Sequence, residues 1–71
     1  MKVNIKALQK LADSNNWSYP YMAKRLGINY SYLFRIMRGE KTGGNKLFSG
    51  IYRLCQEEEL NVDDYIVWDE R

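Results

Sequence analysis

The sequence contains no histidine and only one cysteine, Cys55. A single cysteine cannot form an internal disulfide, a zinc knuckle or a redox pair. Without histidine, Ser-His and Cys-His catalysis and histidine-based metal binding are excluded. No carboxylate pair stands in a recognisable acid/base arrangement, and an active-site cleft is hard to build in one small core. We therefore expect a binding protein and not an enzyme, with no metal ion, cofactor or small-molecule ligand.

Long apolar runs are also absent. No stretch approaches the roughly eighteen apolar residues of a membrane span, and the N-terminus lacks the apolar segment of a signal peptide. Hydrophobic residues make up 45% of the chain, an ordinary share for a globular protein. The 71 residues suffice for one domain with a small core. We expect a cytoplasmic protein with a single domain over residues 1–71, in which residues 67–71 form an extended or frayed tail.

The charges are unevenly distributed, although the net charge is only +2. Up to Arg53 the chain holds ten basic and two acidic residues, a net charge of +8. From Leu54 onward it holds one basic and seven acidic residues, a net charge of −6. This asymmetry favours a basic surface for a polyanion and an acidic segment kept away from it. Two solvated faces with a chance bias are the alternative interpretation.

Residues that begin and end helices recur along the chain. Side-chain oxygens of asparagine and serine accept hydrogen bonds from the unpaired N–H groups at a helix start, and the candidate N-caps are Asn4, Ser18, Asn29, Asn45 and Asn61. Helix ends are expected at residues 15–16, 27 and 39, where asparagine or glycine tolerates positive φ. Inward positions at helical spacing are Ile5, Leu8, Leu11, Ala12, Leu33, Ile36, Met37, Leu47, Phe48, Ile51, Leu54 and Cys55. The pattern predicts an all-α fold of five short helices.

The segment from Tyr65 to Trp68 has two interpretations. With Val62, residues Tyr65 and Ile66 would form the apolar side of a short final helix after Asn61. The run from Tyr65 to Trp68 is also β-prone and could pair with a copy of itself.

Two of the expected helices are separated only by the turn Gly27-Ile28-Asn29, which suggests a helix-turn-helix. Ala23 would let the helices cross closely, and Gly27 would permit the backbone reversal. The wedge between the helices would be filled by Leu26, Ile28, Leu33 and Ile36.

The stretch from Ser18 to Lys41, Ser-Tyr-Pro-Tyr-Met-Ala-Lys-Arg-Leu-Gly-Ile-Asn-Tyr-Ser-Tyr-Leu-Phe-Arg-Ile-Met-Arg-Gly-Glu-Lys, resembles the lambda-repressor-like, Cro/xenobiotic-response-element group of bacterial and phage regulators. Residues 54–66 are similar to that family's closing helix, short turn and final helix. The resemblance implies a compact five-helix DNA-binding domain with its helix-turn-helix at about residues 19–38. It further implies a sequence-specific transcriptional regulator, and a repressor in particular, that binds double-stranded DNA as a homodimer.

In such folds the second motif helix lies in the major groove with its N-terminal part at the base edges. The expected base-contacting residues are Tyr30, Ser31, Phe34 and Arg35. The expected phosphate-contacting residues are Tyr19, Lys24, Asn29, Arg38, Lys41 and Lys46. The family often has glutamine at the position of Tyr19, whose hydroxyl could also bind a phosphate. Candidate dimer contacts are Tyr65, Val67 and Trp68.

Several residues also have a simpler interpretation. Arg35 and Arg38 could be solvated helix arginines, and residues 57–59, all glutamate, a solvated helix end. An outward Phe34 would meet either a thymine methyl group or a protein surface. The second possibility supports an alternative function, in which the same fold is an antirepressor- or antitoxin-like module that binds another regulator.

Overall fold

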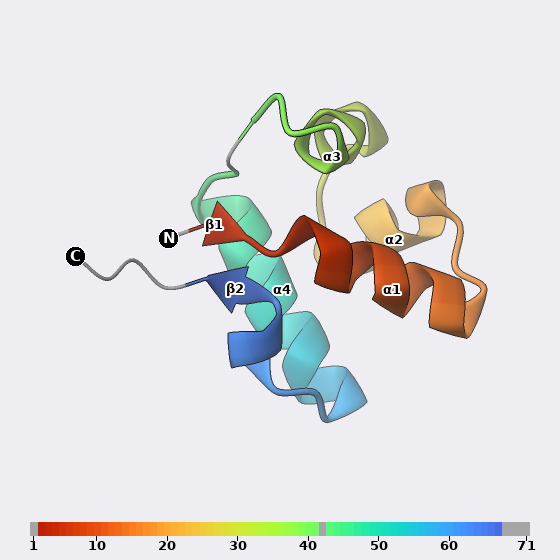
Figure 1. The fold of residues 1–71 in the computed structure, drawn as a ribbon, viewed down its shortest axis with the longest axis vertical. Helices are drawn as coiled ribbons and strands as arrows, with labels where there is room; N and C mark the ends of the chain where they lie inside the picture. The colour runs from red at the N-terminus through yellow and green to blue at the C-terminus, as the bar shows by residue number, and fades with distance from the viewer. Residues whose placement is uncertain (1, 42, 68–71) are drawn as a thin grey trace.

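Residues 2–41 and 43–67 are described by the structure, a computed structural model of the chain. The elements are β1 (Lys2–Val3), α1 (Ile5–Asn15), α2 (Tyr19–Leu26), α3 (Tyr30–Met37), α4 (Asn45–Glu58), the 3₁₀ helix η1 (Val62–Asp64) and β2 (Ile66–Val67) (Figure 1). The described part of the chain is mostly helical, as predicted, but it has four α-helices and not five. The expected fifth helix is wrong because the chain enters β2 at Ile66, so only one short turn fits after Asn61, and such short pieces form 3₁₀ helices.

Four of the five predicted N-caps are confirmed. Their side-chain oxygens accept backbone N–H bonds, Asn4 from Ala7 at 3.2 Å, Ser18 from Tyr21 at 3.2 Å, Asn29 from Ser31 at 2.8 Å and Asn61 from Asp63 at 3.1 Å. The prediction for Asn45 is wrong. Gly44 takes the N-cap position of α4 in an extended conformation and makes no side-chain cap bond, so Asn45 is already the first helical residue.

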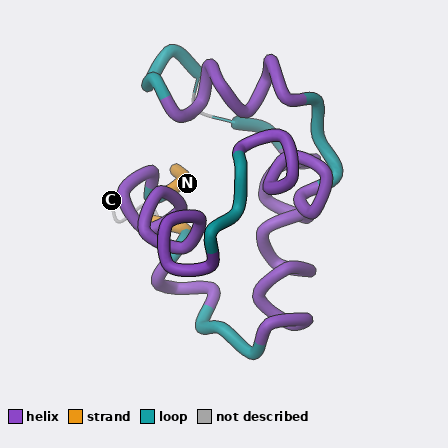
Figure 2. The backbone as a smooth tube through the Cα atoms, turned by 90° about the vertical axis from the view of Figure 1, so that its right-hand side faces the viewer, coloured by secondary structure: helices purple, strands orange, loops and turns teal. Residues whose placement is uncertain are grey.

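The final segment pairs with the start of the same chain. β1 and β2 are antiparallel, with Lys2 opposite Val67 and Val3 opposite Ile66. The Asn4 N–H extends this pairing by donating to the Tyr65 carbonyl oxygen at 2.8 Å. Figure 2 shows both strands beside the two termini. The β-prone interpretation of residues 66–67 is therefore confirmed, but their strand partner is the N-terminal segment and not a second copy. Residues 68–71 of the predicted tail lie outside the described part of the chain.

The predicted inward positions form one core. The buried hydrophobic residues are Val3, Leu8, Leu11, Ala12, Met22, Ala23, Leu26, Leu33, Ile36, Met37, Leu47, Ile51, Leu54, Cys55 and Ile66. Ile5, Ile28, Phe48 and Val62 are half-buried at its edge. Among the described residues, no polar or charged side chain is buried.

The elements are distributed along the long axis of the molecule. α2 packs against both α3 and α4, and α3 lies at one end of the long axis, whereas η1 and the end of α4 lie towards the other (Figure 1). The acidic residues at the end of α4 and in η1 therefore lie away from α3.

Candidate nucleic-acid interface

The turn between α2 and α3 has the geometry predicted for it. Gly27 lies in the left-handed region at φ 75° and donates its N–H towards the carbonyl oxygens of Ala23 and Lys24. Glycine is the residue that adopts this conformation without cost from a Cβ atom. Ala23 is 2% exposed, so a small side chain is buried on α2, which packs against α3.

The sequence did not lead us to expect the close approach of α4 to α2 at Gly50. A Cβ atom at Gly50 would collide with the Leu26 carbonyl oxygen and lie 2.9 Å from the carbonyl carbon. The middle of α4 thus packs directly on the last turn of α2. Gly50 stands inside a helix, where glycine is unfavourable relative to alanine. That local cost is the only signal in the sequence for this contact.

α3 has a buried and an exposed side, as predicted. Leu33 and Ile36 are fully buried and Met37 is 9% exposed. The exposed residues of α3 and its C-cap are Tyr30, Ser31, Phe34, Arg35 and Arg38. The four candidate base-contacting residues therefore share the side of α3 that faces away from the core. We call this side the α3 outer face.

Aromatic rings and an arginine are in contact on the α3 outer face. The ring centroids of Tyr30 and Phe34 are 6.2 Å apart, with a 38° angle between the planes. The Arg38 guanidinium lies over the Phe34 ring at 5.5 Å from its centroid. Glu40 holds the other side of Arg38 through an ion pair of 3.2 Å. Because both partners are exposed, this pair is weak, and another anion can replace Glu40.

The candidate phosphate ligands differ in their surroundings. Lys24, Lys41 and Lys46 are exposed. Lys41 borders a surface hollow formed with Tyr32, Gly39, Glu40 and Gly43. Tyr19 is only half-buried and packs against the core.

Asn29 serves first as the N-cap of α3, because its side-chain oxygen accepts the Ser31 N–H. That bond does not use the side-chain amide donors of Asn29.

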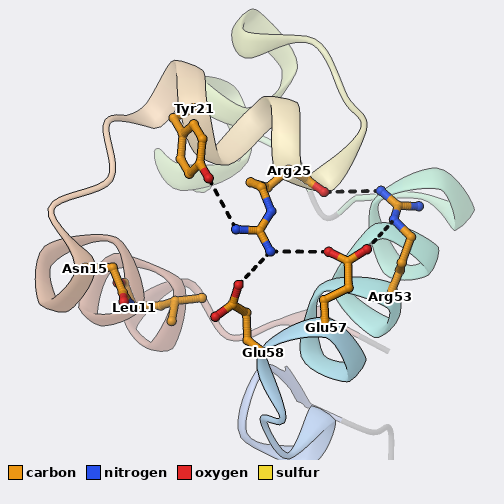
Figure 3. A network of polar contacts seen from close by, with 7 residues as sticks. All are labelled: Leu11, Asn15, Tyr21, Arg25, Arg53, Glu57 and Glu58. Atoms are coloured by element: carbon orange, nitrogen blue, oxygen red, sulfur yellow. Dashed lines mark hydrogen bonds and ion pairs between the residues drawn. The ribbon is translucent and has the colours of Figure 1, made fainter.

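Arg25 stands beside Lys24 in the sequence, but its side chain is part of a network of polar contacts, which Figure 3 shows. Its guanidinium donates to Glu58 at 2.7 Å and to Glu57 at 3.2 Å, and it lies 5.0 Å from the centroid of the Trp17 ring. The hydrogen bonds to Glu58 and Tyr21 raise the pKa of Arg25 above its usual value, so it stays charged.

The same network adds to the interpretation of the glutamates at the end of α4. Glu57, Glu58 and Glu59 are exposed, as expected of a solvated helix end, and Glu57 and Glu58 also pair with Arg25. Arg53 adds a hydrogen bond of 3.2 Å to the Arg25 carbonyl oxygen and an ion pair of 4.0 Å with Glu57. Because the partners are 32 and 33 residues from Arg25, no local pattern in the sequence could have revealed this network.

The candidate dimer contacts have different environments. Tyr65 is half-buried and packs against the core, and this burial raises the pKa of its phenol. Val67 is 51% exposed on β2. Trp68 lies outside the described residues.

Within residues 2–41 and 43–67, no group of three or more Cys, Asp or Glu side chains is arranged to hold a metal ion. No helix in that part of the chain combines the length and the apolar character needed to cross a membrane. Comparisons with protein-family models, with curated proteins and with solved structures found no match to this chain.

Proposed function

We propose that this protein is a sequence-specific DNA-binding regulator of the lambda-repressor-like type, in which α2, the turn at Gly27–Asn29 and α3 form the helix-turn-helix. The observation that supports this most directly is the α3 outer face. Its side chains Tyr30, Ser31, Phe34 and Arg35 are all exposed, while the other side of α3 is anchored in the core. A rigid helix that presents such residues fits the major groove of B-DNA.

The charge distribution supports DNA as the ligand. Between Asp13 and Glu57 the chain contains seven basic residues and a single carboxylate, Glu40. Two of these basic residues, Arg25 and Arg53, are engaged with the end of α4. The remaining five lie on α2, on α3 and its C-cap, in the segment after α3 and at the start of α4: Lys24, Arg35, Arg38, Lys41 and Lys46. Phosphates attract such groups irrespective of sequence, and the base contacts then supply specificity.

In this mechanism Arg35 donates two hydrogen bonds to a guanine, and the lysines and Arg38 contact phosphates on either side. The regulator represses by occlusion, since the bound domain covers a promoter and blocks polymerase. One domain of this size buries only about 600–1,000 Å² on DNA. We therefore propose that two copies bind half-sites about one helical turn apart, roughly 34 Å. Val67 and Trp68 are the candidate contacts between the copies.

The exposed rings also suit a protein-interaction module, the second candidate function. Tyr30 and Phe34 are 45% and 42% exposed and touch each other. A regulator that binds another protein through α3 would bury both rings. In that case the basic residues would have no phosphates to contact, and DNA affinity would be weak and insensitive to sequence.

Binding selection on randomised duplex DNA tests the proposal. Repeated selection with the 71-residue chain should enrich a defined site, and footprinting should protect two related half-sites. Affinity for the selected site should fall steeply with salt, with a log–log slope of about −3 per chain for three to four phosphate contacts. Failure to enrich any sequence, together with a flat salt dependence, would overturn the proposal and favour the protein-interaction module.

A further inference from the structure

The α3 outer face has an unusual composition for a surface that is to read base edges by hydrogen bonding. Phe34 has no polar group, and it is 42% exposed. Tyr30 touches it from the preceding turn, with 6.2 Å between the ring centroids. The Arg38 guanidinium lies over it from the following turn at 5.5 Å, and an exposed ion pair of 3.2 Å joins Arg38 to Glu40. The Phe34 ring is therefore contacted from the preceding and the following turn.

Phe34 is not needed for the core. Leu33 and Ile36, its neighbours on α3, are fully buried on the opposite side of the helix. Among residues 2–41 and 43–67, the Phe34 ring makes its ring contacts with Tyr30 and Arg38. Its apolar surface gains free energy only when a ligand covers it.

The chemistry of the major groove limits what such a ring can contact. The base edges there carry hydrogen-bond donors and acceptors, and the one apolar group is the C5-methyl of thymine. A phenyl ring placed on an amino group or a carbonyl would remove water without replacing the lost hydrogen bond, which is unfavourable. A ring placed on a methyl group avoids this penalty.

The charges around the ring favour DNA over an apolar protein surface. Arg35 and Arg38 flank Phe34 on α3, and both are exposed. The nearest carboxylate in the sequence, Glu40, is paired with Arg38. A ligand that covers Phe34 must also accept these two cations, and the phosphates and guanine edges of DNA do so.

We propose that Phe34, supported by Tyr30, recognises the C5-methyl group of a pyrimidine in the DNA site, beside the base pair contacted by Arg35. This inference depends on the proposed function and adds the class of site. The rise along one DNA strand is about 3.4 Å per base, so two rings 6.2 Å apart together cover about two base-pair steps. The preferred half-site therefore contains one or two thymines next to a guanine.

Removal or addition of single methyl groups on the DNA bases tests this inference. In the selected site, each thymine is replaced in turn by deoxyuridine, which keeps the base pairing and removes only the methyl group. At one or two positions the affinity of the unmodified protein should fall about four-fold, the change that corresponds to one buried methyl group. Where cytosine replaces the same thymine, 5-methylcytosine should bind more tightly than cytosine. That comparison separates the methyl group from the thymine O4 atom.

Two variants assign the effect to a residue. Phe34→Ala should remain folded, because the ring is exposed, and thermal melting checks this. It should bind thymine and deoxyuridine sites with equal affinity at the sensitive position. Tyr52→Ala is the matched control, because Tyr52 is an aromatic residue 55% exposed on α4, and it should keep the methyl preference.

The outcomes separate the two proposals. Binding of a defined site without any dependence on the methyl group, or a preference that survives in Phe34→Ala, would overturn the inference about Phe34 and leave the proposed function intact. Absence of specific DNA binding in the unmodified protein would overturn both, and would indicate that the rings bind a protein surface.

Discussion

The guanidinium of Arg25 lies 2.7 Å from the carboxylate of Glu58 and joins α2 to the end of α4. The preceding residue in α2, Lys24, is exposed. Two adjacent cations of the same helix therefore have different environments. The side chain of Arg25 is 21% exposed and stabilises the packing of α2 on α4, whereas Lys24 is available to a ligand.

This difference predicts that two matched substitutions affect different properties, stability in one case and DNA binding in the other. Arg25→Gln should lower the free energy of unfolding by about 1 kcal/mol, since it removes two partly exposed ion pairs and two cation–π contacts. Lys24→Gln should change stability by less than about 0.5 kcal/mol but weaken DNA binding and reduce the salt slope by about one. Urea denaturation and DNA titration measure the two effects. The assignment would be wrong if folded Arg25→Gln lost more DNA affinity than Lys24→Gln.

The close contact of Gly50 with Leu26 predicts that alanine destabilises the domain at a helical position. Helix propensity alone favours Gly50→Ala by about 1 kcal/mol. The added methyl group would meet backbone atoms, which cannot move as a side chain does, so we expect a net loss of about 1–3 kcal/mol. Ser49→Ala, at the exposed neighbouring position, is the control and should stay within about 0.5 kcal/mol of the unmodified protein. An increase in melting temperature for Gly50→Ala would contradict this packing.

Arg35 and Lys46 should separate base recognition from phosphate contact. Arg35→Ala should cost about 1–3 kcal/mol on the selected site and relax the preference at one base pair. Lys46→Ala should weaken selected and random DNA about equally and reduce the salt slope by about one. Both side chains are exposed, so neither melting temperature should change much. If Arg35→Ala left the base preference unchanged, the α3 outer face would not be the reading surface.

The buried thiol of Cys55 predicts a loss of stability at alkaline pH. Burial raises the pKa of Cys55 in the folded state, whereas the unfolded chain ionises near the usual value of about 8.5. Below that pH both states keep the proton and the thiol has no effect on stability. Above it the unfolded state loses its proton first, so the free energy of unfolding falls until the pH passes the raised folded pKa.

Urea denaturation at about pH 7 and about pH 9.5, on either side of that usual value, measures this effect. The unmodified protein should lose more stability between the two values than Cys55→Ala does. Tyr65, whose pKa burial also raises, acts in the same direction above about pH 10 and remains in both proteins. Equal losses in the two proteins would show that folding does not raise the pKa of the Cys55 thiol.

Much of the local structure could be predicted because its causes lie within a few residues. The caps at Asn4, Ser18 and Asn29 work through hydrogen bonds that span two or three residues. The turn at Gly27 depends on its own φ angle. The division of α3 into a buried and an exposed side follows from helical periodicity. The sequence by itself therefore determined the four α-helices, the turn and the exposed side of α3.

Only the tertiary structure decided the features that join distant residues. Ile66 lies in a strand because the N-terminal segment, with Val3 opposite Ile66, pairs with it. Gly50 is buried because the backbone of Leu26 packs against it. Arg25 has a different role from its neighbour Lys24 because the packing of α4 places the Glu58 carboxylate 2.7 Å from the Arg25 guanidinium. In each case the residue type permits more than one role. The packing of the helices selects among these roles, because it determines which distant group lies within contact distance.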